Sequence, residues 1–315
     1  MTGAAVDLAR AGGPDAEIAA LVEEIVAAGW PEELQAARLA MEAEGPPLSP
    51  DIAVEPAILA GRPAQWLRAP GCGAEAGIVL YLHGGGYSYG SLTSHQGLVG
   101  EIARGTGGAA VQLDYRLAPE HPYPAGLTDA LTAYRDLLAA GHAAEGIALV
   151  GDSAGGGMVL ALMLALRDAG DPLPRAAVCL SPWVDLTVSG ESYGTRADSD
   201  PMIDAELAGM LAQWYAPGQD LRDPLISPLY GDLAGLPPLL IQVGAREVLF
   251  SEAESAARRA AAAGVPVIFE EWPAMIHVWH LYFHRLTRGR DAIARLCAFL
   301  RDPVAATSDQ KRTAP

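Results

Sequence analysis

Two kinds of hydrophobic pattern divide the chain. Near the N-terminus, two stretches carry apolar residues at the spacing of one helix face: Ile18, Leu21, Val22 and Ile25 in the first, and Leu34, Ala37 and Met41 in the second. This pattern predicts two amphipathic helices. Because the apolar face of each helix must be covered, we expect residues 1–45 to form a helical cap segment against the rest of the protein.

From Ile78 onward the pattern changes to short apolar runs that end in glycine or polar turns, which is typical of strands buried on both faces of a parallel sheet. The runs are IVLYLH, AAVQLDY, IALVGDS, RAAVCLS, PLLIQVG and VIFEEW. Helical stretches at 128–140, 155–168, 251–263 and 291–300 separate several of them. The alternation predicts an α/β fold for residues 46–315, with a mostly parallel central sheet and helices on both faces.

One stretch, residues 185–221, interrupts this alternation. It follows the run RAAVCLS, is long, and contains the helical-looking sequence IDAELAGMLAQWY. We expect an insertion that joins the N-terminal helices in a cap over the functional site.

Charge and lysine content exclude several classes of function. The 315 residues include 21 basic and 38 acidic side chains, a formal charge of −17, which argues against binding to nucleic acid or anionic membranes. Lys311, in the polar C-terminal stretch, is the only lysine. Schiff-base and pyridoxal-phosphate enzymes, phosphate-loop nucleotide-binding proteins and S-x-x-K hydrolases are therefore excluded.

Cysteine use and hydropathy indicate a cytoplasmic protein. Cys72, Cys179 and Cys297 are odd in number and widely spaced, so free structural thiols are expected. The N-terminus lacks a basic start followed by an apolar stretch, and the longest uncharged apolar run lies between Asp152 and Arg167, too short to span a bilayer. We expect no stable membrane insertion. The sequence is compatible with a homodimer.

The strongest chemical motif runs from Gly151 to Gly155 as G-D-S-A-G, which matches G-x-S-x-G. A glycine-rich chain produces such a match by chance fairly often. Here, however, it lies between a predicted strand and a predicted helix, where a nucleophilic serine on a tight turn needs glycine on both sides. This context favours Ser153 as a nucleophile.

A second glycine motif, HGGGY from His83 to Tyr87, follows the run IVLYL. Its exposed backbone N–H groups could stabilise an oxyanion, although a plain turn or a nucleotide-binding loop would use the same residues. The only G-x-G-x-x-A match, at 105–110, precedes a predicted strand instead of following one, so the dinucleotide interpretation is disfavoured.

A serine nucleophile needs a base and an acid, which follow the serine in the order acid, then histidine, in this type of fold. Glu247 follows the run PLLIQVG and His277 follows VIFEEW, so both lie at the carboxyl ends of predicted strands. Asp223 is the alternative acid, but it precedes its strand. His277, His280 and His284 could also share a helix face as metal ligands; no carboxylate or cysteine accompanies them at close spacing, so we expect no metal.

Several ordered motifs together resemble the hormone-sensitive-lipase-like, or bacterial family IV, esterases of the α/β-hydrolase superfamily. They are HGGGY, YRLAPEHPYPA, GDSAGG, LSPWVDLT, DPLISPLY and MIHVW. The resemblance implies Ser153 as nucleophile, His277 as base, an N-terminal cap, and hydrolysis of short-acyl carboxylic esters. It also implies an oxyanion hole formed by the N–H groups of Gly85, Gly86 and Ala154. Most members have aspartate where this chain has Glu247.

This triad chemistry requires no cofactor. It would equally serve a lactone hydrolase or an N-acetyl amide deacetylase, because the fold does not fix the substrate. A non-catalytic small-molecule receptor, like the plant gibberellin receptors that resemble this family, is disfavoured because the triad is complete. Arg116 and Glu120, in YRLAPEHP, are interpreted as a structural ion pair or turn lock.

The two predicted cap regions and the motif loops supply candidate walls for a small acyl pocket, which would favour acyl groups of about two to six carbons. The candidate substrate-binding residues are Tyr87, Trp183, Met202, Met210, Trp214, Leu249 and Val278, with Trp30 and Leu211 as further cap residues.

Overall fold

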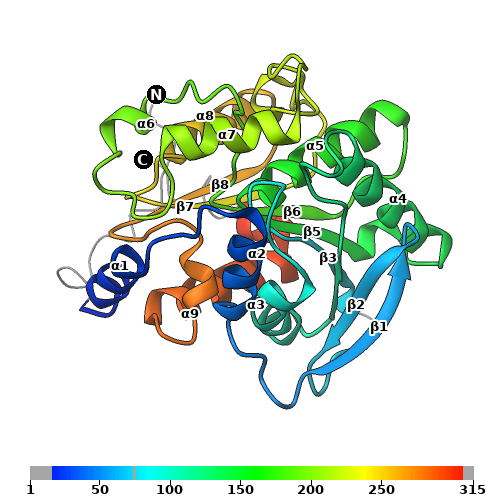
Figure 1. Ribbon diagram of the computed structural model, residues 1–315. Coiled ribbons are helices and arrows are strands. Elements are labelled where there is room, and N and C mark those ends of the chain that lie inside the picture. The colour runs from blue at the N-terminus through cyan, green and yellow to red at the C-terminus, as the bar shows by residue number, and fades with distance from the viewer. Residues whose placement is uncertain (1–15, 74–75, 308–315) are drawn as a thin grey trace, which may run out of the picture.

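The computed structural model describes residues 16–73 and 76–307 and contains one eight-stranded sheet (Figure 1). The strands are β1 (Ala53–Leu59), β2 (Arg62–Arg68), β3 (Ile78–Leu82), β4 (Ala109–Leu113), β5 (Ile147–Asp152), β6 (Ala176–Leu180), β7 (Leu239–Gly244) and β8 (Val267–Trp272), in the order β1-β2-β4-β3-β5-β6-β7-β8. β3 to β8 pair in parallel, and each coincides with one of the predicted runs. The mostly parallel α/β fold is confirmed.

The helices are α1 (Ala16–Ala28), α2 (Leu34–Ala43), α3 (Leu92–Thr106), α4 (Ala125–Ala139), α5 (Ala154–Ala169), α6 (Ser192–Thr195), α7 (Ala205–Tyr215), α8 (Phe250–Ala262) and α9 (Thr287–Arg301), with short 3₁₀ turns at Ala144–Gly146, Pro228–Tyr230 and Trp279–Tyr282. α4, α5 and α8 cover one face of the sheet, and α3 and α9 cover the other (Figure 1). Neighbouring residues of β3 point into different cores: Leu80 packs on the first face and Val79 on the second. This double burial explains the continuous apolar runs.

Two parts of the fold were not predicted. β1 and β2 form an antiparallel hairpin, and β2 joins the sheet antiparallel to β4. β1 is mostly exposed and contains Pro56, so it lacks an apolar run. α3, which was also not predicted, begins at a capping box. The Ser91 hydroxyl accepts the Ser94 N–H, and the Ser94 hydroxyl accepts the Ser91 N–H.

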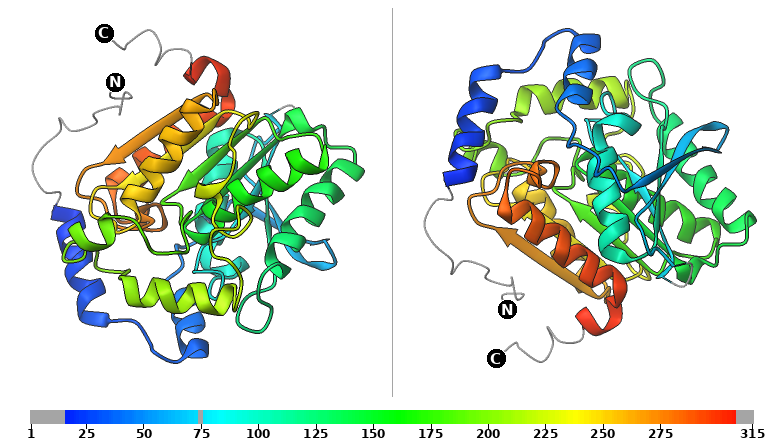
Figure 2. Two further views of the ribbon diagram at one scale, coloured as in Figure 1. Left: turned by 90° about the horizontal axis from the view of Figure 1, so that it is seen from above. Right: turned by 90° about the horizontal axis from the view of Figure 1, so that it is seen from below.

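The N-terminal helices and α7 lie together beside the carboxyl ends of the parallel strands; both views in Figure 2 place α2 next to α7. Ile18 and Leu21 of α1 are buried against Trp272 and Trp279. The predicted helices over 18–25 and 34–41 are present, whereas residues 1–15 of the predicted cap segment lie outside the described residues. The division of the chain at residue 45 and the extent of the insertion at 185–221 stay predictions. Among the described helices, none combines the length and apolar character needed to cross a bilayer.

Candidate active site

Ser153 occupies a sharp turn between β5 and α5. Its backbone has φ +52° and ψ −122°, a conformation that L-residues rarely adopt. The turn is closed by contacts that only glycine permits: a Cβ on Gly155 would lie 2.0 Å from the Leu82 carbonyl oxygen, and one on Gly151 would lie 2.4 Å from the Gly155 carbonyl oxygen. The strained turn projects the Ser153 side chain beyond the end of the strand.

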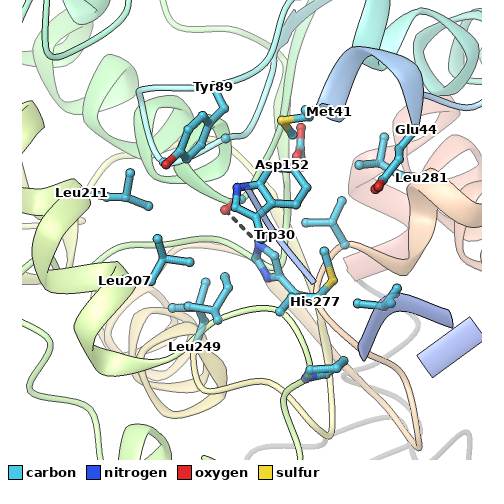
Figure 3. Close-up of a pocket in the computed structure, with 18 of the residues that line it drawn as sticks. Trp30, Met41, Glu44, Tyr89, Asp152, Leu207, Leu211, Leu249, His277 and Leu281 are labelled. Carbon is cyan, nitrogen blue, oxygen red and sulfur yellow. Dashed lines mark hydrogen bonds between the residues drawn. The ribbon is translucent and has the colours of Figure 1, made fainter. Parts of the chain in front are cut away.

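His277 and Glu247 complete a hydrogen-bonded row with this serine. His277 Nε2 lies 2.9 Å from Ser153 Oγ, and Nδ1 lies 2.8 Å from Glu247 Oε2. Figure 3 shows the His277 ring beside the cavity with its hydrogen bond drawn. The alternative acid, Asp223, lies instead in a turn, where its carboxylate accepts the Leu225 N–H.

The row is buried, and its members stabilise one another's charges. Glu247 is inaccessible to solvent, and this burial raises the pKa of its carboxyl although His277, Ser181 and the Gly244 N–H all donate hydrogen bonds to it. Burial also favours neutral His277, but the hydrogen bond and negative charge of Glu247 prevail and raise the pKa of the imidazole above its usual value. An imidazolium formed next to Ser153 would therefore be stabilised.

The HGGGY loop brings backbone donors next to Ser153. Gly85 has φ +106° and Gly86 has φ +57°, and the Gly85 carbonyl accepts the N–H groups of Ser88 and Tyr89 in a tight turn. In the part of the chain that the structure describes, no hydrogen bond uses the N–H of Gly85 or Gly86. Ala154 is the first residue of α5, where an N–H has no partner within the helix. The loop and the helix therefore offer unpaired donors at the serine.

A buried polar network around Asp152 anchors the HGGGY loop. The carboxylate of Asp152, which is 1% exposed, accepts hydrogen bonds from the Gly84 N–H at 2.9 Å and the Tyr81 hydroxyl at 2.7 Å. His95 Nε2 lies 3.3 Å from its other oxygen. The Asp152 pKa is lowered: burial opposes ionisation, but the His95 charge and the hydrogen bonds outweigh it. Asp152 thus links the HGGGY loop to the turn at Ser153.

A cavity of about 340 Å³ opens above Ser153 and His277. Figure 3 shows Leu207 and Leu211 of α7 on one side and Met41 and Leu281 on the other. Further lining residues include Ile25, Val26, Trp30, Glu44, Tyr89, Ile203 and Tyr282. Trp30 and Leu211 were named from the sequence as further cap residues, and Ile25 and Met41 belong to the predicted helix patterns of α1 and α2.

Four of the candidate substrate-binding residues line this cavity: Trp183, Met202, Leu249 and Val278. The other three, Tyr87, Met210 and Trp214, are not among its lining residues. Met210 is 38% exposed, and Trp214 packs against the main core. Tyr87 is 2% exposed and stacks on Tyr215, with the ring centres 3.8 Å apart.

The remaining candidates have separate partners. His280 is buried with Nε2 2.9 Å from Gln242 Oε1, and His284 is exposed, so these two do not join His277. Arg116 and Glu120 do not pair with each other as expected: Arg116 binds Asp129 at 2.7 Å, and Glu120 binds Arg38 at 2.7 Å. Folding brings each of them a partner that is distant in sequence, 13 residues away for Arg116 and 82 residues away for Glu120. The three cysteines are free, as predicted.

Comparison with known proteins assigns the family. A family model described as alpha/beta hydrolase fold matches residues 79–281. The chain belongs to the α/β-hydrolase family. This hydrolase is 48% identical over 238 residues to an acetyl-hydrolase of Streptomyces hygroscopicus, covering 76% of this chain and 79% of the relative. It is 32% identical over 258 residues to an esterase of Acinetobacter venetianus, covering 80% and 83%.

Solved structures show which group of α/β hydrolases this chain resembles. The hydrolase superposes on an esterase of the bacterial hormone-sensitive lipase family with a TM-score of 0.89 and 45% identity, covering 92% of this chain and 99% of the other. An esterase/lipase from an uncultured bacterium gives a TM-score of 0.88 and 43% identity, with the same coverage. The resemblance to hormone-sensitive-lipase-like esterases is confirmed.

Proposed function

We propose that this α/β hydrolase is a serine carboxylesterase that cleaves short-acyl esters through an acyl-serine intermediate at Ser153. The observation that carries the proposal is the hydrogen-bonded row from Ser153 through His277 to Glu247 at the floor of an apolar cavity. Membership of the ester-hydrolysing relatives in the same family supports it.

The geometry supports a two-step mechanism. Ser153 Oγ attacks the ester carbonyl while His277 Nε2 takes its proton, and the unpaired N–H groups of Gly85, Gly86 and Ala154 stabilise the oxyanion. His277 then gives this proton to the alcohol as it leaves. A water molecule, deprotonated by the same imidazole, attacks the acyl-serine, and the imidazolium returns this proton to Ser153 Oγ as the acid is released. Glu247 fixes the tautomer of His277 and stabilises the imidazolium in both steps.

The cavity supports a preference for short acyl chains. Side chains of α7 and of the N-terminal helices close it on two sides, so a long chain would have to displace them or stay in water. Each methylene buried before the pocket is full contributes about 0.8 kcal/mol. One solved neighbour, 43% identical to this chain, comes from crystals soaked with p-nitrophenyl butyrate.

A second candidate is removal of an acetyl group from an amide or alcohol, because the Streptomyces hygroscopicus relative is named an acetyl-hydrolase. The same acyl-serine chemistry would serve it, as it would serve a lactone.

A p-nitrophenyl ester series from acetate to palmitate tests the proposal, with a lactone and an N-acetyl amide as parallel substrates. We expect kcat/KM to peak with acyl groups of about two to six carbons, at the per-methylene scale above. Ser153→Ala should lower kcat by about 10⁵ to 10⁶. Residual activity of Ser153→Ala near that of the unsubstituted enzyme would contradict the mechanism, and higher kcat/KM on the amide would favour the deacetylase.

Two narrower parts of the proposal concern the molecule in the cell. We place the hydrolase in the cytoplasm, on its free thiols and acidic composition, and allow for a homodimer. Cell fractionation tests the location, and light scattering on the purified protein tests its oligomeric state.

A further inference from the structure

Ser181 lies between the loops that carry the proposed triad. Four neighbouring parallel strands, β5, β6, β7 and β8, lie side by side in the sheet. Ser153 follows β5, Glu247 follows β7 and His277 follows β8, whereas Ser181 follows β6. It belongs to the motif LSPWVDLT, which takes no part in the proposed two-step ester hydrolysis.

The hydroxyl of Ser181 joins two of these loops. Ser181 Oγ lies 2.7 Å from Glu247 Oε1, and the N–H of Val278 donates to the same Oγ at 3.1 Å. Because an N–H can only donate, the oxygen of Ser181 accepts there and its own O–H must point to the carboxylate. One hydroxyl therefore fixes the acid and the residue that follows the base.

The connection is buried and conformationally demanding. Ser181 is 0% exposed and has φ +45°, and Val278 has φ +44°, which is an uncommon conformation for a β-branched residue. The chain beyond Ser181 is anchored by other bonds: Trp183 N–H donates to the Ser153 carbonyl, and Val184 N–H donates to Glu252. The Ser181 hydroxyl is thus not needed to hold its own segment.

We propose that Ser181 is a positioning residue for ester hydrolysis, which orients the Glu247 carboxylate and holds the His277 loop through Val278. The inference rests on the proposed function. With Oε1 held by Ser181, Oε2 faces His277 Nδ1. The donated hydrogen bond also withdraws charge from the carboxylate, so that Glu247 holds the proton of imidazolium less tightly.

The test uses Ser181→Ala and Ser181→Gly in the full chain. Both remove the hydroxyl, but glycine adopts the positive φ without strain, so a backbone effect would separate the two variants. We expect both to lower kcat about 10-fold to 100-fold, as for loss of a hydrogen bond to a charged group, with KM unchanged. Without the donated bond the carboxylate becomes more basic, so the acid limb of kcat/KM should move to higher pH in both.

Ser227→Ala is the matched control. Ser227 is equally buried, and its Oγ accepts the Leu186 N–H at 2.8 Å without touching the triad. Its pH profile should stay that of the unsubstituted enzyme. The inference is overturned if the acid limb of the Ser181 variants does not move upward, if their kcat falls no further than that of Ser227→Ala, or if glycine restores activity. An unsubstituted enzyme without esterase activity would instead refute the proposed function.

Discussion

Alanine at Gly85 and alanine at Gly86 should have different kinetic effects, although each adds a single methyl group to the same loop. Gly85 has φ +106°, outside the region that alanine readily adopts. A Cβ there would lie 2.6 Å from the carbonyl carbon and oxygen of Tyr89. Because the Tyr89 N–H also donates to the Gly85 carbonyl, this backbone cannot move aside without opening the turn.

Gly86 has φ +57°, which alanine enters at a cost of about 1–2 kcal/mol. Its added Cβ would lie 2.5 Å from Leu211 Cδ1, the end of a flexible side chain that can rotate away. We therefore expect Gly85→Ala to lose an oxyanion donor, a decrease of about 10² to 10³ in kcat with KM little changed. Gly86→Ala should lower kcat about 10-fold, which corresponds to the strain energy of this backbone conformation. It should also alter the acyl-length profile, because Leu211 lines the cavity.

The assay is steady-state kinetics on p-nitrophenyl butyrate, with thermal unfolding to show that each variant is folded. Gly194→Ala is the control, since Gly194 has no positive φ and a Cβ there meets nothing within 4 Å. If folded Gly85→Ala matched Gly194→Ala in kcat, the loop would not be supplying the oxyanion donors.

Three other outcomes follow from the site. Glu247→Gln should lower kcat about 10⁴-fold while Asp223→Asn stays near normal; the reverse pattern would assign the acid to Asp223. Because Glu247 raises the pKa of His277 despite burial, kcat/KM should fall as the pH drops through a value above ~6.5, and that limb should move to lower pH in Glu247→Gln. Trp30→Ala, which opens the N-terminal wall of the cavity, should raise kcat/KM for octanoate relative to butyrate; an unchanged ratio in the ester series would show that this wall does not limit chain length.

The hydrogen-bonded row of Ser153, His277 and Glu247 could be predicted because each residue follows a local sequence signal. The glycines around Ser153 are required because a Cβ added at Gly151 would lie 2.4 Å from the Gly155 carbonyl oxygen in the turn, and one added at Gly155 would lie 2.0 Å from the Leu82 carbonyl oxygen on β3. Glu247 and His277 each follow an apolar run, and the carboxyl ends of parallel strands meet at one edge of the sheet. The two residues lie close together because β7 and β8 are neighbouring strands of the sheet.

The cavity wall could not be predicted in the same way. α7 carries apolar residues around much of its circumference, so its sequence does not say which face is turned to the site. The structure turns Leu207 and Leu211 inward, whereas Met210 and Trp214 point elsewhere. Which face of α7 lines the cavity depends on how the helix packs against the rest of the chain. The hairpin of β1 and β2 was missed for a related reason, because β1 is mostly exposed and the apolar residues of β2 are interrupted by Arg62, Gln65 and Arg68, so neither strand is a continuous apolar run.

Arg38 shows why the cap cannot be treated only as a wall. From α2, its Nε donates to the Ser88 carbonyl at 2.8 Å and its Nη2 to the Ala118 carbonyl at 3.0 Å, while Glu120 holds its guanidinium. The Ser88 N–H in turn donates to the Gly85 carbonyl. The position of α2 is therefore linked through two hydrogen bonds to the loop that carries the proposed oxyanion donors. A change that displaces α2 would act on kcat as well as on acyl-chain selectivity, whereas loss of the Trp30 ring leaves the Arg38 contacts intact and acts on selectivity.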